Sequence, residues 1–175
     1  MKPLYKRILG DTYAQLPQAV QALHAYEGEA LYRGHCDVER GSHGLSNFFA
    51  NLLSLPKAGK AVEVAVKFSQ QGEKEVWQRS FAGKPFKSVQ WLQGGLLYER
   101  LNFTTLLFEV VANSECLSLN LKGVRVLGIP MLAFLRPNVV AQEHEVEGKF
   151  QFTIHTIVPI IGLLVAYKGT LEKVD

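Results

Sequence analysis

The chain has 175 residues, of which 47% are hydrophobic and 20% are charged, and its formal net charge is +3. This length and balance favour a globular protein with a single domain spanning residues 1–175. Basic residues are interleaved with acidic ones, and no basic stripe of the kind that binds phosphates is present, so a nucleic-acid partner is not expected.

The first third of the chain predicts short helices. Leu4, Ile8 and Leu9 recur at helical spacing before a Gly-Asp pair breaks the run. A second helix is expected after Leu16, because Pro17 is tolerated in the first turn of a helix. These helices precede the part of the chain in which the pattern changes to period two.

A strand is predicted over residues 30–40, where apolar and polar residues alternate and Arg40 falls on the apolar parity. Ser42 is the expected N-cap of a short third helix, because a serine side chain can accept a hydrogen bond from the free amides of the first turn. Everything after residue 60 again alternates with period two between glycine-containing turns. The one exception is a break at residues 128–130, followed by a single helical turn.

The alternation predicts about nine or ten short antiparallel strands. With helices confined to the first third and one short insert, parallel βαβ winding is not expected. The predicted fold is α+β: a large curved antiparallel sheet closes into a barrel, and the N-terminal helices cover one opening or edge.

The residues at both ends of the chain bear on location. The N-terminal residues lack an apolar signal segment, which argues against secretion. The most apolar stretch, residues 157–166, has about half of the roughly 20 residues that a membrane-spanning helix needs. Pro159 and Gly162 also interrupt it. We therefore expect a cytoplasmic protein without a membrane span.

The stretch over residues 73–101 contains the most informative pattern. Trp77 and Phe81 share one face of a strand with Arg79, and Glu99 lies on the apolar face of a later strand. Because the apolar residues mark the face that points to the core, both charged side chains are predicted to point inward. If the strands form a meander, Arg79 and Glu99 should interact directly or through water.

Arg40 and Glu143 also lie on or next to the apolar parity of their strands. An isolated charge in a dry core is very costly, so these side chains must be paired, hydrated or facing a ligand. Two interpretations remain open: a buried ion-pair network that fixes the register of the barrel, and a cavity in which arginine binds the carboxylate or phosphate of a ligand. The candidate ligand-binding residues are Arg40, Arg79, Glu99, Trp77, Phe81, Glu143 and Tyr167.

Motifs of enzyme or metal chemistry are missing. The five histidines are scattered, and no pair has the spacing that places two zinc ligands on one helix face. Cys36 and Cys116 lie apart in apolar segments without a C-x-x-C motif, so we expect buried thiols, with a disulfide left open. The sequence names no catalytic residue, metal or cofactor, although a triad assembled from distant residues stays open.

Several short motifs resemble one family when taken together. In chain order they include Pro3-Leu4-Tyr5, Glu39-Arg40-Gly41, Trp77-Gln78-Arg79-Ser80-Phe81, Glu99-Arg100, Gly128-Ile129-Pro130, Gly148-Lys149-Phe150, Pro159-Ile160-Ile161-Gly162 and Tyr167-Lys168-Gly169. They resemble an uncharacterised bacterial domain of unknown function, found alone or fused to saccharopine-dehydrogenase-like NAD(P)-binding proteins. The resemblance covers nearly the whole chain and implies a bacterial, cytoplasmic module that works beside a Rossmann-type enzyme. It supplies no catalytic residues, and no G-x-G-x-x-G motif predicts dinucleotide binding by this chain itself.

The sequence leaves two functions in competition. The first is a non-enzymatic barrel that binds a lipophilic or amphipathic acidic small molecule, in a cavity of about a few hundred cubic ångströms with Arg40 or Arg79 at one end. The second is a structural or interaction module that docks a Rossmann-type partner or a second copy of itself. The second would have a filled interior and an exposed apolar patch around residues 159–164.

Overall fold

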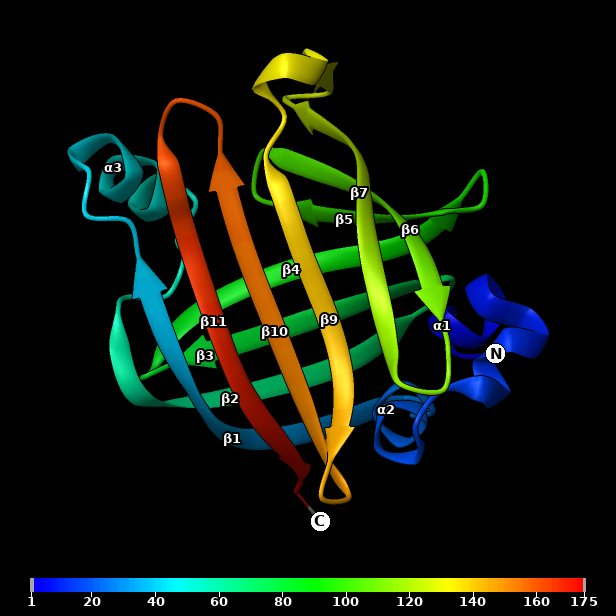
Figure 1. Ribbon diagram of the computed structural model, residues 1–175. Helices are drawn as coiled ribbons and strands as arrows, with labels where there is room; N and C mark the ends of the chain where they lie inside the picture. The colour runs from blue at the N-terminus through cyan, green and yellow to red at the C-terminus, as the bar shows by residue number, and fades with distance from the viewer. Residues whose placement is uncertain (1, 175) are drawn as a thin grey trace.

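The protein is built on one antiparallel β-sheet that closes on itself (Figure 1). The structure, a computed structural model, describes residues 2–174. Over these residues the sheet has eleven strands in the order β6-β5-β4-β3-β2-β1-β11-β10-β9-β7-β8, and β6 also pairs with β7. All strands except β8 therefore form a closed ten-stranded barrel, which confirms the predicted α+β barrel.

The bounds of the elements are as follows. The helices are α1 (Leu4–Leu9), α2 (Gln18–His24) and α3 (Gly44–Leu52), with two 3-10 helices, η1 (Gly10–Gln15) and η2 (Ala133–Leu135). The strands are β1 (Glu29–Arg40), β2 (Gly59–Gln71), β3 (Lys74–Phe81), β4 (Lys84–Gln93), β5 (Leu96–Leu101), β6 (Thr104–Ala112), β7 (Cys116–Val126), β8 (Ile129–Pro130), β9 (Asn138–Val146), β10 (Lys149–Val158) and β11 (Gly162–Lys173).

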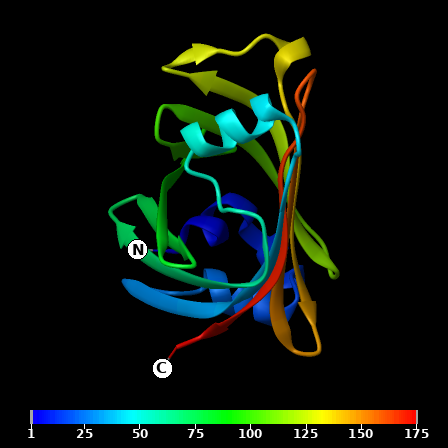
Figure 2. The same cartoon turned by 90° about the vertical axis from the view of Figure 1, so that its left-hand side faces the viewer.

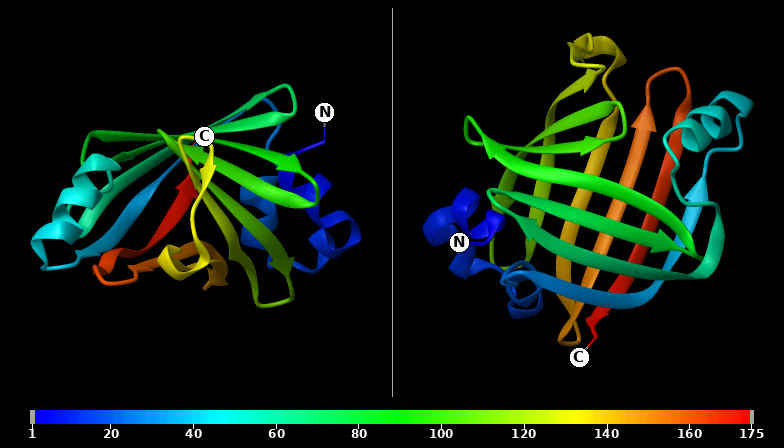
Figure 3. Two further views of the ribbon diagram at one scale, coloured as in Figure 1. Left: turned by 90° about the horizontal axis from the view of Figure 1, so that it is seen from above. Right: turned by 180° about the vertical axis from the view of Figure 1, so that it is seen from behind.

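Closure depends on pairings between strands that are distant in the chain. The first strand, β1, pairs with the last strand, β11, while β6 pairs with β7 and β7 pairs with β9. The wall formed by β2 to β5 crosses the wall formed by β9 to β11, and the core lies between them (Figure 3). Alternate side chains of the barrel strands point into this core, as the period-two pattern predicted.

Two glycines permit the tight contact where β1 and β11 join these walls. A Cβ atom on Gly169 would lie 2.3 Å from the carbonyl oxygen of His35, and one on Gly34 would lie 1.9 Å from the carbonyl oxygen of Thr170. Real Cβ atoms do not approach backbone oxygens so closely. Glycine at these inward positions therefore allows the sheet to bend sharply, as barrels require.

The helices lie at different parts of the barrel. The N-terminal helices α1 and α2 cover one end, where α1 packs on β4 and β6 and α2 packs on β9 and β10 (Figure 2). Helix α3 lies elsewhere, against β11 and β1. Its predicted Ser42 cap is wrong: the N-cap residue is His43, which makes no side-chain cap bond. Instead the buried Ser46 hydroxyl donates to the carbonyl oxygen of Leu163 at 2.5 Å, which holds the helix to β11.

Two further predictions can be compared with the structure. The predicted break at residues 128–130 is wrong in part, because Ile129 and Pro130 form the short strand β8, which pairs with the last two residues of β7. The helical turn predicted after it is confirmed as η2. Within residues 2–174, no helix combines the length and apolar character needed to cross a membrane.

Both cysteines are buried and unpaired, which confirms the expected thiols and excludes the disulfide in this structure. Burial, and secondarily the nearby Asp37 carboxylate, raises the pKa of the Cys36 thiol to about 11.

Candidate functional site in the barrel interior

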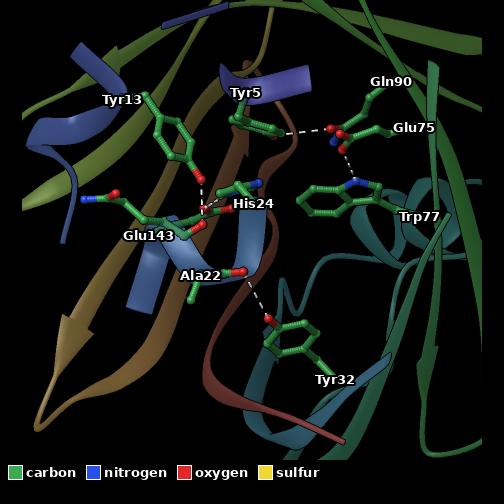
Figure 4. Close-up of polar contacts among 10 residues, drawn as sticks. Tyr5, Tyr13, Ala22, His24, Tyr32, Glu75, Trp77, Gln90 and Glu143 are labelled. Atoms are coloured by element: carbon green, nitrogen blue, oxygen red, sulfur yellow. Dashed lines mark hydrogen bonds and ion pairs between the residues drawn. The ribbon is translucent and has the colours of Figure 1, made fainter. Parts of the chain in front are cut away.

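A buried polar network lies inside the end of the barrel that α1 and α2 cover (Figure 4). Its members come from helices and strands that are far apart in the chain: Tyr5, His24, Glu75, Arg79, Ser88, Gln90, Glu99 and Glu143. Buried polar groups must find partners to offset the loss of water. The hydrogen bonds of this network fall into three groups, which lie next to one another.

The first part is centred on Arg79. Its guanidinium donates to Glu99 Oε1 at 3.2 Å and to Ser88 Oγ at 2.8 Å. It also lies over the ring of Trp77, with 4.7 Å between Cζ and the ring centroid, and 5.6 Å from that of Phe86. The predicted interaction of Arg79 with Glu99 is therefore confirmed. Their strands are not hydrogen-bonded neighbours, because β4 runs between them, and Arg79 reaches across it past Ser88.

The second part joins α2 to β9. His24 Nε2 and Glu143 Oε2 are 2.6 Å apart, and the His24 side chain is fully buried. A carboxylate oxygen accepts, so Nε2 donates, and Nδ1 is left without a hydrogen-bond partner among residues 2–174. The ring of Tyr5 stacks on the imidazole, with the centroids 3.7 Å apart. Because Tyr5 belongs to α1 and His24 to α2, this stacking joins the two helices.

The third part is centred on Glu75, which is 1% exposed. Its carboxylate accepts from the backbone N–H of Leu4 at 2.9 Å and from Trp77 Nε1 at 3.4 Å. The first of these bonds satisfies a free amide at the start of α1. The hydroxyl of Tyr5, one residue further along, donates to Gln90 Oε1 at 3.2 Å. The start of the chain is thereby tied to β3 and β4.

Carboxylates surround Tyr5. Burial raises the pKa of the Tyr5 hydroxyl well above its ordinary value, and the charges of Glu143, Glu99 and Glu75 raise it further, while Arg79 acts in the opposite direction. The network thus contains three glutamates but one arginine and one histidine. Its interior has a surplus of acceptors over cationic donors.

Next to the network lies a cavity with a volume of about 70 Å³. Arg79 and Glu143 form its polar part, and its walls are mostly apolar, with Trp77, Phe81 and Tyr167 among them. The rings of Phe81 and Tyr167 meet edge to face at 5.6 Å. Burial raises the pKa of Tyr167 to about 12, although the Arg79 charge lowers it in part. The cavity is smaller than the few hundred cubic ångströms expected from the sequence.

A larger and shallower hollow, of about 350 Å³, lies on the outer wall of the barrel beside His35, Asp37, Gln151, Lys168 and Gly169. It is open to solvent, and no member of the buried polar network lines it. The interior cavity is therefore the better candidate for a site.

Most of the residues selected from the sequence do lie together. Arg79, Trp77, Phe81, Glu143 and Tyr167 all line the interior cavity. Glu99 does not line it, but is bonded to Arg79.

Arg40 is separate from this site. It holds the loop after α3 by donating from Nε to the carbonyl oxygen of Pro56 at 2.6 Å, from one terminal nitrogen to Asn51 Oδ1 at 2.8 Å and from the other to Leu55. The expectation that Arg40 faces the ligand is therefore not supported by its position. Its inward parity reflects a structural contact instead.

Sequence reasoning missed five members of the network: Tyr5, His24, Glu75, Ser88 and Gln90. A signal existed for Glu75, because it lies two residues before Trp77 on the same strand parity and so shares its inward face. His24 stands on the apolar stripe of α2, which indicated burial without indicating a partner. Nothing in the local pattern around Tyr5 indicated that its hydroxyl would be buried.

Residues 2–174 contain no group of three or more histidine, cysteine, aspartate or glutamate side chains placed to hold a metal ion. The interior cavity and the buried polar network together can bind polar groups by hydrogen bonds and apolar groups by contact.

No curated protein matches this chain. Residues 16–171, however, match the model of a family described as Domain of unknown function (DUF4166). This match begins two residues before α2 and ends within β11, and so includes residues of every strand of the barrel and all members of the polar network except Tyr5. The chain therefore belongs to the DUF4166 family.

Proposed function

We propose that the barrel binds one small amphipathic molecule with an acidic head group. The observation that supports this proposal is the interior cavity, whose apolar walls adjoin two ionisable side chains, Arg79 and Glu143. Binding sites for small molecules typically combine apolar walls with a few polar groups that fix the orientation of the ligand. No part of the proposal requires catalysis or a cofactor.

Arg79 would take the head group. Only two hydrogen bonds of its guanidinium are made to residues 2–174, and a guanidinium has further N–H donors on its planar edge. Glu143, on the same cavity, can only accept when ionised. A protonated carboxylic acid or a hydroxy acid satisfies both, because it accepts from arginine and donates an O–H to glutamate. A phosphate would be repelled by the glutamates of the network.

The size of the cavity limits the ligand. Pockets for drug-sized ligands measure roughly 300–1,000 Å³, whereas this cavity measures about 70 Å³. We therefore propose either a ligand of few atoms, or a longer one of which only one end enters the cavity while the aromatic side chains of the wall move aside.

Native mass spectrometry of freshly purified protein, followed by displacement of a fluorescent fatty acid, tests this proposal. Arg79→Ala should abolish binding, whereas Arg40→Ala, which removes an inward arginine outside the cavity, should leave it unchanged. Because Arg79→Ala leaves Glu99 unpaired and threatens folding, Ala141→Leu provides a second variant. It adds volume to a residue that lines the cavity and should exclude the ligand while circular dichroism shows a folded barrel.

The proposal fails if the wild-type protein carries no bound mass and displaces no probe. It also fails if Ala141→Leu binds as well as the wild-type protein does. In that case the second function, a module that docks a Rossmann-type partner or itself, becomes the better interpretation. Ile160, within the segment predicted for such docking, is 95% exposed.

A further inference from the structure

Three segments of this chain combine exposure with a complete lack of charged residues. They are residues 41–56, which include α3, residues 126–135, which include β8 and η2, and residues 156–167, which include the β10–β11 turn. None contains Asp, Glu, Lys or Arg. Most of the large hydrophobic side chains that the structure exposes lie in these segments; those more than half exposed include Leu45, Phe48, Leu127, Ile129, Phe134 and Ile160.

The three segments lie at the same end of the barrel. In Figure 1, α3, the β10–β11 turn and the loop with β8 and η2 all stand at the top, opposite the β9–β10 turn and the C-terminus. Figure 2 shows the same three segments together in the upper half from another direction. We call their exposed apolar residues the apolar rim. Exposed apolar side chains gathered at one end of a molecule are typical of a contact with another apolar phase or molecule.

Basic residues flank the apolar rim. The first charged residues on the two sides of residues 41–56 are Arg40 and Lys57, and those beside residues 126–135 are Arg125 and Arg136. The first charged residue after residues 156–167 is Lys168.

A further lysine adds to the positive charge next to α3. Lys84, the first residue of β4, lies close enough to Lys57 and Arg40 that their charges lower its pKa. The charged residues that directly border the three segments in the sequence are therefore basic.

This combination favours one kind of partner. Apolar side chains at one end of a molecule, with a border of lysine and arginine, match the interface of an anionic lipid bilayer, where apolar groups enter the acyl boundary and basic groups contact head groups. A second copy of the chain fits less well, because its basic residues would face those of the first. A protein partner usually requires several hydrogen bonds across the contact, and residues 126–135 offer no polar side chain for them.

We propose that the apolar rim docks this protein on the surface of a bilayer containing anionic lipid. The bilayer is contacted from one side and not crossed. This inference goes beyond the proposed function and does not depend on it, because the rim lies outside the interior cavity.

Flotation with lipid vesicles tests the inference. The protein should float with vesicles of phosphatidylcholine containing phosphatidylglycerol, and bind vesicles of phosphatidylcholine alone at least about tenfold more weakly, because basic residues near an anionic surface contribute to binding. Leu132→Ser combined with Phe134→Ser should reduce binding to the anionic vesicles by about tenfold or more, since two apolar side chains no longer enter the bilayer. Both residues are exposed, so the barrel should stay folded.

Matched controls separate docking from general loss of hydrophobicity. Val111→Ser combined with Val146→Ser changes two exposed apolar residues away from the rim and should leave flotation unchanged. Lys57→Gln combined with Lys84→Gln should weaken binding to the anionic vesicles only. Lys2→Gln, at the end of the chain near α1, should have no effect.

Three results would overturn the inference. One is the absence of binding to either kind of vesicle, and another is an equal loss of binding in the rim and control variants. The third is a concentration-dependent dimer that the rim variants convert to a monomer while the vesicles stay unbound, which would assign the rim to a second copy. Because ligand displacement is measured without vesicles, failure here is distinct from failure of the proposed function.

Discussion

The inward charged residues of this barrel have different roles. Arg79, Glu99 and Glu143 belong to the buried network, while Arg40 holds a loop at a distance from it. Of the two interpretations open from the sequence, the buried ion-pair network is present, and the binding of a ligand by its arginine stays a prediction. Two members of the network, Arg79 and Glu143, also line the interior cavity. For a buried ion pair, removing one partner is far more costly than the net contribution of the pair, because the other charge is left in the interior.

Glu99→Gln should lower the free energy of unfolding by about 3 kcal/mol or more, because Arg79 would lose its charged partner in the interior. Both side chains of this pair are nearly buried, with 13% of the arginine and 11% of the glutamate exposed. Urea denaturation followed by circular dichroism measures the change. Glu109→Gln breaks the exposed pair with Lys122 and should change stability little. Equal effects of the two variants would show that Arg79 is hydrated and not dependent on Glu99.

Stability should fall at alkaline pH partly through Tyr167. Its pKa is raised in the folded protein from an ordinary 10.0 to about 12. The folded state therefore holds the proton more tightly, so this contribution is fully present below pH 10 and is lost as the pH rises toward 12. The variant Tyr167→Phe has no hydroxyl to ionise. Its free energy of unfolding should therefore fall by roughly 2–3 kcal/mol less than that of the wild-type protein as the pH rises through this range.

Urea denaturation at pH 8 and at pH 11.5 measures this difference. Parallel losses in the two proteins would mean that Tyr167 ionises at its ordinary pKa and is in contact with water.

At the scale of elements, the N-terminal helices depend on side chains of the barrel. Helix α1 has only six residues and no side-chain cap of its own, and isolated helices of this length are unstable in water. The carboxylate of Glu75 supplies the missing acceptor for Leu4 from a strand 71 residues away. Helix α2 is held in the same manner by the contact of His24 with Glu143. The network therefore closes the barrel end as well as adjoining the cavity.

Glu75→Ala should detach α1 from the barrel, because the Leu4 amide and Trp77 Nε1 lose their acceptor. We expect faster hydrogen exchange at the amides of residues 4–9, measured by mass spectrometry, while the strands stay protected. Glu75→Gln keeps an acceptor oxygen and should preserve more of the protection. The exposed neighbour Glu73 provides the control variant Glu73→Gln. Unchanged exchange in Glu75→Ala would mean that packing of Leu4 and Tyr5 alone holds the helix.

At the scale of the whole molecule, stability depends on closure. Because β1 pairs with both β2 and β11, and β6 pairs with both β5 and β7, no barrel strand leaves an edge unpaired. Exposed sheet edges favour aggregation, and closure removes them. The pairing of β1 with β11 requires nearly the entire chain, so the barrel can form only when the last strand is present.

A chain that ends at residue 161 should lack a cooperative thermal transition, because β1 and β10 would both lose a neighbour. Near-ultraviolet circular dichroism and thermal unfolding measure this. The control replaces residues 127–135 by a glycine-serine segment of equal length, which removes β8 from outside the barrel and should keep the transition. A cooperative transition in the shortened chain would show that closure is not needed for folding.

The sequence by itself determined the elements and the fold class, because alternation reports which face of a strand is buried and glycine-rich turns report where strands end. It also determined that Arg79 and Glu99 point inward. Strand parity could not show which inward residues meet. Only the tertiary structure brought Tyr5, His24 and Glu75 together with Glu143, because the contacts of this network join residues separated by as many as 119 positions. The tertiary structure also shows that Arg40 and Arg79 lie apart. Strand parity indicates which face of a strand a residue is on, but not its position along the barrel axis. The collection of three charge-free segments at one end likewise follows from the closure of the barrel, which the local pattern does not specify.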